Sequence, residues 1–142
     1  VEENLLAVLE VLSALTAQER QHRADKILAD FGIAHKRDSK GATLSGGERR
    51  RVEIARAVVL KPLFMLLDEP FAGLSVDERA DIKELLKSIP PEVTIIMIEH
   101  DMDVALEFAE RISLMHFGEM VFEGSRAEVV DHPRTREIYL GE

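Results

Sequence analysis

The 142-residue sequence predicts an α/β fold with a mainly parallel sheet and flanking helices. Two short apolar runs, LFMLL at 63–67 and VTIIMI at 93–98, have the length and composition of strands. Amphipathic helical patterns precede the first run, separate the two runs and follow the second. This alternation is typical of a parallel sheet, and two consecutive strand patterns further along predict an antiparallel edge.

Two helices are predicted at the start of the sequence. Apolar residues at helical spacing place them at 4–15 and 18–31, and a T-x-x-E capping pattern begins at Thr16, between them. Gly32 ends the second helix, and a polar loop follows. We therefore expect a helical subdomain over 1–43.

The predicted α/β core covers 44–142. Its first helix, at 46–60, carries small and β-branched apolar residues on one face and ends before a proline. The strand at 63–67 is apolar throughout, which predicts that both of its faces are covered. A helix at 76–88 follows and is stopped by a pair of prolines.

Shorter elements complete the predicted core. A helix at 102–110 comes after the second strand, and strands at 112–117 and 119–123 are expected to form a hairpin. Its turn is predicted at Gly118-Glu119, as a two-residue turn of the Gly-X kind. The last helical patterns lie at 126–131 and 134–140.

Charge and cysteine content exclude several classes of function. The sequence has 27 acidic and 18 basic residues, a net charge of -9, whereas nucleic-acid binding requires clustered cations. It has no cysteine, which excludes disulfides and thiolate metal sites. No apolar run reaches the roughly 20 residues that span a bilayer. We therefore expect neither a nucleic-acid partner nor a membrane-spanning helix.

The stretch LSGGE opens the helix predicted at 46–60. Ser45 and the two glycines after it leave backbone N–H groups unpaired at a helix start, where the helix dipole favours an anion. Ser45 and Glu48 also satisfy S-x-x-E, the pattern of a capping box, which recurs at Ser75 and at Ser125. Taken alone, the stretch leaves an anion site and an ordinary helix cap equally open.

Two carboxylates follow the first predicted strand. Asp68 and Glu69 stand at its carboxyl end, where α/β proteins bind ligands. Mg²⁺ commonly takes one carboxylate together with phosphates and waters, and a second carboxylate can polarise an attacking water. A solvated turn is the alternative. His100 comes just after the second strand, so we expect it at the same sheet edge, although an isolated histidine is more often structural.

The order and spacing of these motifs decide between the alternatives, because essentially the whole sequence resembles the ATP-binding cassette (ABC) ATPases. LSGGE resembles the signature motif of that family, and FMLLDE resembles its Walker B strand. AGLS at 72–75 lies where the D-loop belongs, His100 where the switch histidine belongs, and 1–43 resembles the helical subdomain. The resemblance implies a partial P-loop NTPase fold with a C-terminal β-hairpin, and ATP and Mg²⁺ as cofactors.

The resemblance also implies a shared nucleotide site. In this family two ATPase subunits meet head to tail, and each ATP lies between the Walker A loop of one subunit and the signature motif of the other. Ser45, Gly46 and Gly47 would therefore bind the γ-phosphate of ATP held mainly by a partner subunit. Glu48 and Ser75 belong to the same implied nucleotide-binding set. Many relatives have Asp where this sequence has Ser75, so we expect Ser75 mainly to cap the following helix.

Three further residues have implied roles in hydrolysis. Asp68 would hold the Mg²⁺ hydration shell, Glu69 would orient and deprotonate the attacking water, and His100 would contact the γ-phosphate. The implied partners are a second ATPase subunit and transmembrane permease subunits. The implied location is peripheral, at the cytoplasmic face of the inner membrane.

A Walker A loop, G-x-x-x-x-G-K-[ST], is missing from the sequence, because none of its eight glycines is followed by lysine. We therefore expect the C-terminal portion of a longer subunit, which alone does not hydrolyse ATP. Without the Walker A strand the sheet is expected to expose an edge or a bare face, and the isolated chain to be marginally stable.

Within the family, ENLLAV, DEPFAGLS, IEHDMDVALEFAERI and YLGE most resemble ATP-binding subunits of branched-chain amino acid uptake systems, which also work with a solute-binding protein. Related export and lipopolysaccharide-transport ATPases share some of this wording. Two other interpretations stay open. One is the ATPase head of a DNA-repair or chromosome-maintenance protein, although the sequence has no extended heptads. The other is a non-catalytic short form that donates a signature half-site to a partner.

Overall fold

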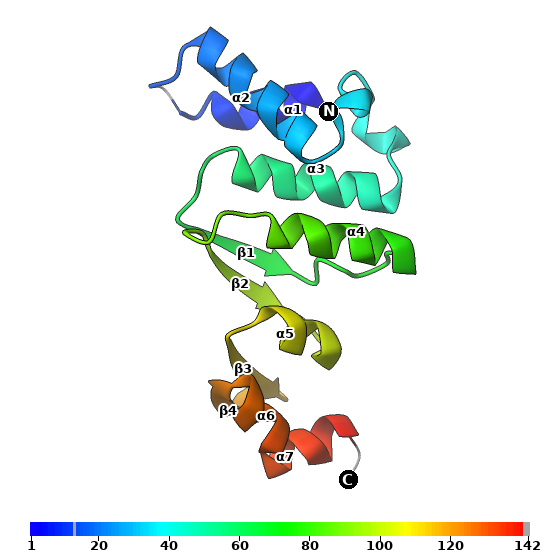
Figure 1. Ribbon diagram of the computed structural model, residues 1–142, viewed down its shortest axis with the longest axis vertical. Coiled ribbons are helices and arrows are strands. Elements are labelled where there is room, and N and C mark those ends of the chain that lie inside the picture. Colours follow the sequence, from blue (N-terminus) through cyan, green and yellow to red (C-terminus); the bar gives the residue numbers. More distant parts are fainter. Residues whose placement is uncertain (13, 141–142) are drawn as a thin grey trace. The chain divides into compact units, whose positions relative to one another are not determined.

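The computed structural model describes residues 1–12 and 14–140 and divides the chain into two compact units, Val1–Ile96 and Met97–Glu142. Helices and strands follow one another in nearly the predicted order (Figure 1). The boundary predicted between the helical subdomain and the α/β core lies inside the first unit, and that division stays a prediction.

The first unit begins with two helices, α1 (Glu2–Leu9) and α2 (Ala17–Asp30). Helix α1 packs against α2 and α3, and it buries Leu5 and Leu9 completely. The predicted helix at 4–15 is too long, because α1 ends at Leu9, and the capping box of Thr16 then starts α2. Ser13, inside that predicted range, lies outside the described residues.

An ion-pair network ties the loop after α2 to both helices. Arg37 contacts Glu2 of α1 at 2.7 Å and Asp25 of α2 at 2.6 Å. Within this segment, predicted only as a polar loop, lie two single-turn helices, η1 (Ala34–Lys36) and η2 (Gly41–Thr43). The network holds the chain in place ahead of α3.

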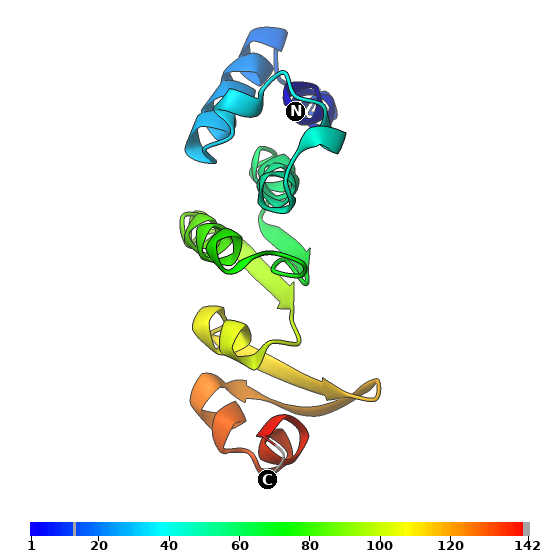
Figure 2. The same cartoon turned by 90° about the vertical axis from the view of Figure 1, so that its right-hand side faces the viewer.

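The α/β part of the first unit contains α3 (Gly46–Val58), β1 (Phe64–Asp68) and α4 (Val76–Lys87), and β2 (Thr94–Ile98) pairs with β1 in parallel. Helices α3 and α4 lie side by side in both ribbon views (Figures 1 and 2). Arg51 joins them, because its guanidinium contacts Asp81 of α4 at 2.6 Å and donates to the Phe31 carbonyl at 3.1 Å.

The prediction that β1 is covered on both faces is wrong for the described chain. Met65 is buried, but its neighbour Leu66 is 70% exposed. Ile96 of β2 is likewise 55% exposed. Alternate residues of a strand point to opposite faces, and no described element covers the second face. The bare sheet face expected from the missing Walker A loop is thus present.

The second unit is built on a hairpin of β3 (Arg111–His116) and β4 (Glu119–Ser125), paired antiparallel. Its turn is Phe117-Gly118 rather than the predicted Gly118-Glu119. Both turn residues have positive φ, 46° and 79°, which is the backbone pattern of a type I′ hairpin rather than a Gly-X turn. The observed turn also matches the right-handed twist of the two strands.

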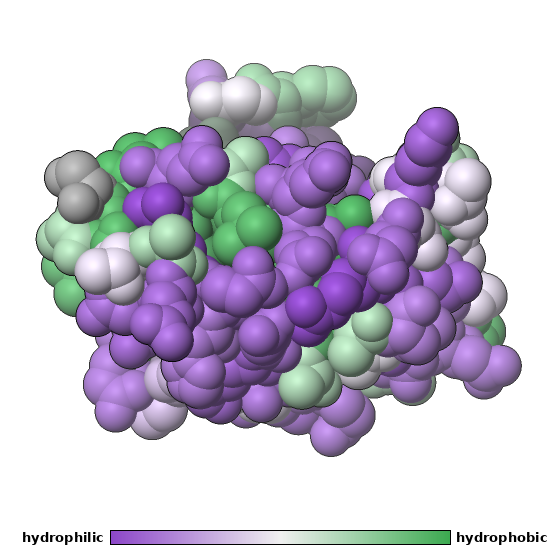
Figure 3. Space-filling view, turned by 90° about the horizontal axis from the view of Figure 1, so that it is seen from above, coloured by the Kyte–Doolittle hydropathy of each residue, from purple (hydrophilic) through white to green (hydrophobic). Residues whose placement is uncertain are grey.

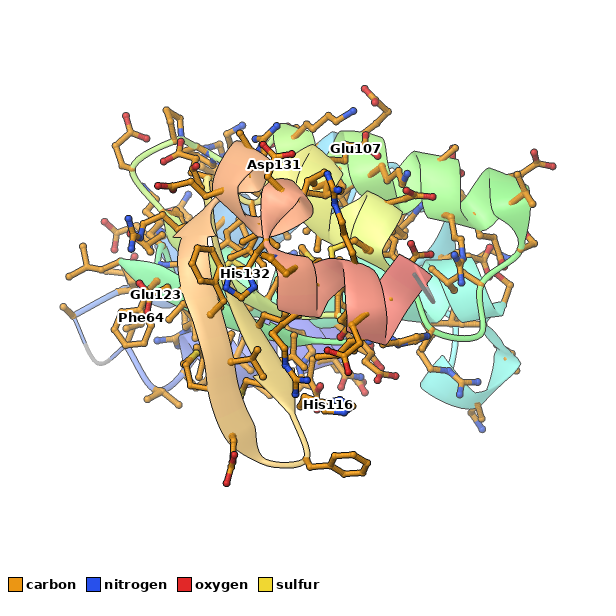
Figure 4. All side chains as sticks on the ribbon, turned by 90° about the horizontal axis from the view of Figure 1, so that it is seen from below. Phe64, Glu107, His116, Glu123, Asp131 and His132 are labelled. Carbon is orange, nitrogen blue, oxygen red and sulfur yellow. The ribbon has the colours of Figure 1, made fainter. Side chains whose placement is uncertain are left out.

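Short helices accompany the hairpin. They are α5 (Met102–Phe108), α6 (Arg126–Asp131), α7 (Pro133–Thr135) and the π-helical turn η3 (Arg136–Leu140). His132 stacks on Phe122 of β4 with ring centroids 4.2 Å apart, and Figure 4 shows it beside that strand, away from His116. The predicted motif YLGE ends with two residues outside the described range.

Surface character agrees with the composition. The face shown in Figure 3 is mainly hydrophilic, with hydrophobic residues gathered in patches. Among the described residues no helix combines the length and the apolar character needed to cross a bilayer.

Candidate functional site

The start of α3 carries the motif LSGGE in the form of a complete capping box. The Ser45 hydroxyl accepts from the Glu48 N–H at 3.1 Å, and Glu48 Oε2 accepts from the Ser45 N–H at 2.9 Å. The cap is therefore confirmed. It does not exclude an anion site, because Ser45 and Gly46 are exposed and the Gly46 N–H has no hydrogen-bond partner among the described residues.

Glu48 is held by more than its cap. Its second carboxylate oxygen, Oε1, lies 3.1 Å from the Lys36 ammonium and 3.8 Å from His35. The hydrogen bond from the Ser45 backbone, and then the contact with Lys36, lower the pKa of Glu48 below its ordinary value. Glu48 thus fixes the start of α3 against η1, which is a structural task beside its implied place in the nucleotide site.

Gly47, the second glycine of the motif, is buried and already engaged. Its N–H donates to Glu78 Oε1 of α4 at 2.8 Å, while Glu78 Oε2 accepts from the Ser75 N–H at 3.0 Å. The sequence pattern predicts Glu78 only as the capping partner of Ser75, and the structure confirms that capping box. Nothing in the spacing indicated the second contact, because it joins residues 31 positions apart.

The carboxyl end of β1 presents the two predicted acids. Asp68 and Glu69 are both exposed. Glu69 has a φ of 43°, in the left-handed region that few non-glycine residues adopt. The Ala72 N–H donates to the Glu69 carbonyl at 3.0 Å and closes the turn, which the buried side chain of Phe71 anchors in the core. Strained backbone of this kind gathers at functional sites.

The elements that carry these features share one end of the first unit. Figure 1 shows that α3 and α4 begin at the end where β1 finishes. Ser45, Gly46, Gly47, Asp68, Glu69 and Ser75 all belong to this unit, whereas His100 belongs to the second. His100 is exposed, and the residue after it, Asp101, caps α5 by accepting from two backbone N–H groups. The role of His100 stays a prediction.

Two hollows lie near these elements. A small one of about 170 Å³ between α3 and β1 is lined in part by Asp68, Arg50 and Glu53. A larger open groove of about 460 Å³ is lined by α1, η2 and α3, including Arg49 and Arg56. Among the described residues no cluster of three or more His, Asp or Glu side chains is placed to hold a metal ion. Asp68 fits the mode in which one carboxylate joins phosphates and waters around Mg²⁺.

Comparisons with known proteins agree with these motifs. The family model described as ABC transporter matches residues 1–72. The lipopolysaccharide export system ATP-binding protein LptB of Haemophilus influenzae is 41% identical over 143 aligned residues, covering 100% of this chain and 59% of LptB. LptB of Escherichia coli strain K12 is 39% identical over the same shares of both chains.

Solved structures give the same result for the fold. The ADP conformation of MJ1267, an ATP-binding cassette of an ABC transporter, matches with a TM-score of 0.78 and 30% sequence identity, over 99% of this chain and 62% of that chain. A nucleotide-free ATP-binding cassette from an ABC transporter matches with a TM-score of 0.78 and 29% identity. The chain therefore spans less than two thirds of the length of each of these relatives.

Proposed function

Because the chain belongs to the ABC transporter family, we propose that it supplies the signature motif and the catalytic carboxylates of a subunit that hydrolyses ATP to drive transport. The fold supports this proposal, since it is a partial ABC ATPase fold with one parallel and one antiparallel strand pair. The observation that carries the proposal is the start of α3, where Ser45 and Gly46 are exposed and the Gly46 N–H has no partner among the described residues. A phosphate at that position would meet the positive end of the helix dipole.

The chemistry assigned to each residue follows from its position. Ser45 and Gly46 would hold the terminal phosphate of ATP bound mainly by a partner. Glu69, exposed at the end of β1, would orient the attacking water and accept its proton. Asp68 would bind the hydration shell of Mg²⁺, which when present neutralises phosphate charge. Phosphoryl transfer depends mostly on such positioning and charge stabilisation.

The proposal implies specific partners. A second ATPase subunit would face the start of α3, and transmembrane permease subunits would hold the pair at the cytoplasmic side of the membrane. Family membership and the names of the relatives favour this transport role over a DNA-repair or chromosome-maintenance head. Within the proposal, the helical subdomain covers 1–43 and His100 acts as the switch histidine.

Two transported substrates are supported by different observations. The sequences of the motifs favour branched-chain amino acid import, which would add a solute-binding protein to the partners. Relatives at 39–41% identity are named as lipopolysaccharide export ATPases, and they favour export of that glycolipid. Rescue of growth separates the two. We expect the full-length subunit to restore either a strain depleted of LptB or a branched-chain amino acid auxotroph that lacks its uptake ATPase; rescue of neither would contradict both cargoes.

The phosphate-binding role of Ser45 can be tested directly. In the full-length subunit, we expect Ser45→Arg to abolish ATP-driven dimerisation, measured by light scattering, because it places a bulky side chain where the phosphate would bind. Ser125→Arg is a matched control, since Ser125 is also the serine of a capping box, at the start of α6. Dimerisation that survives Ser45→Arg, or that is lost equally in both variants, would reject the proposed role.

A further inference from the structure

Glu78 is set apart from the other capping carboxylates of this protein. Capping boxes start α2, α3, α4 and α6, and their carboxylates are Glu19, Glu48, Glu78 and Glu128. Among the described residues, only Glu78 also accepts a hydrogen bond from the backbone of a second helix. One carboxylate thus joins the start of the signature helix α3 to the start of α4.

The contact fills the space that the second glycine leaves. A Cβ atom at position 47 would lie 2.9 Å from both Cγ and Oε1 of Glu78, closer than real side-chain contacts allow. The Gly47 N–H donates to Oε1 at 2.8 Å, and the hydrogen bonds from the Ser75 and Gly47 backbones lower the pKa of Glu78. With Glu78 in this position there is no room for a Cβ atom at position 47.

The donors that Glu78 holds are among those expected to bind phosphate. Gly47 belongs to the implied γ-phosphate set, yet in this structure its N–H donates to the carboxylate of Glu78. A carboxylate and a phosphate cannot both accept from this one N–H, and their like charges repel at hydrogen-bond distance. The arrangement leaves the Gly46 N–H open and occupies the Gly47 N–H.

We propose that Glu78 is an internal anion, whose carboxylate occupies the phosphate site of the signature motif until the terminal phosphate of ATP displaces it. This inference rests on the proposed function. Displacement breaks the bond to Gly47 and leaves the bond to the Ser75 N–H, because that one belongs to the cap of α4. Phosphate binding then breaks the link between the start of α3 and the start of α4. The AGLS loop, which precedes α4, is thereby coupled to whether phosphate is bound.

Glutamine at position 78 separates the two tasks of the side chain. Its single carbonyl oxygen can still cap Ser75, as Gln does in natural capping boxes. Its NH₂ group cannot accept from Gly47, so the phosphate site opens without loss of the α4 cap. Two controls match it. Asp77→Asn removes the same charge from the same helical turn, and Glu128→Gln makes the same change in the box of α6.

Tightness of ATP-driven dimerisation of the full-length subunit is the readout. We expect Glu78→Gln to tighten dimerisation about tenfold, the ratio that the loss of one competing charge-assisted hydrogen bond gives. Asp77→Asn and Glu128→Gln should leave it within about twofold of the unchanged protein. Unchanged or weaker dimerisation in Glu78→Gln, or equal tightening in Asp77→Asn, overturns the proposal.

A second measurement keeps this test separate from the proposed function. The amide resonance of Gly47 in glycine-labelled protein should shift in Glu78→Gln, and on adding ATP to the unchanged protein; a resonance that moves in neither case overturns the inference. If Ser45→Arg does not impair dimerisation, the proposed function fails. If Ser45→Arg impairs it while Glu78→Gln has no effect, only the role of Glu78 fails.

Discussion

Removing the Phe71 side chain should destabilise both the first unit and the loop that carries Glu69. Phe71 is 1% exposed and is the largest of the fully buried side chains. It lies two residues after Glu69, whose left-handed backbone conformation has to be maintained by its surroundings. Phe71→Ala therefore removes core packing and the anchor of the turn that carries Glu69 together.

The magnitude follows from burial. Truncation of a buried Phe to Ala costs about 3–5 kcal/mol, from lost transfer free energy and from the cavity left behind. Folded domains are stable by only about 5–15 kcal/mol, so the change removes a large part of the total. At about 2–4 °C per kcal/mol for a chain of this size, the melting temperature should fall by roughly 6–20 °C.

Urea unfolding followed by circular dichroism measures the effect, with Phe117→Ala as the matched control. Phe117 is 93% exposed, so the same truncation should change the free energy of unfolding by less than about 0.5 kcal/mol. Phe71→Leu keeps most of the buried volume and should cost less than Phe71→Ala. Equal effects of Phe71→Ala and Phe117→Ala would refute this account of the loop.

Three further predictions concern the site, the caps and the hairpin. In the full-length subunit, Glu69→Gln should lower ATP hydrolysis by about 10²–10⁴-fold while ATP still binds; near-normal turnover would reject Glu69 as the base. Glu48 and Glu78 have pKa values below their ordinary 4.5, so their stabilising effect is complete above pH 4.5 and is lost as the pH falls through the lower folded values. Urea midpoints that do not fall below pH 4.5 would contradict this. Gly118→Ala, at a φ of 79°, should destabilise the hairpin by about 1–2 kcal/mol, whereas Gly41→Ala, with open space around it, should not; equal urea midpoints would exclude strain at the turn.

Local rules explain why most elements were predictable from the sequence. Each capping box is a contact between residues three apart, so S-x-x-E at Ser45, Ser75 and Ser125 identified three helix starts that the structure confirms. The predicted end of α1 was wrong because the apolar spacing continues past Leu9, whereas the helix ends there. The predicted position of the hairpin turn was wrong because a non-glycine residue, Phe117, adopts a positive φ.

In the candidate site, too, local features were predictable from the sequence and tertiary contacts were not. Asp68 and Glu69 were predictable because a strand end is a local feature, whereas the burial of Phe71 is a tertiary feature that no local pattern indicates. Glu78 was missed for the same reason. Its pattern with Ser75 was fully satisfied by a local cap, which gave no cause to look for a second partner. A capping carboxylate has two oxygens and its cap requires one, so every capping box leaves an acceptor that tertiary structure can use. At Glu78 that spare oxygen contacts Gly47, and the stability of a helix start is thereby coupled to the part of the chain expected to bind phosphate.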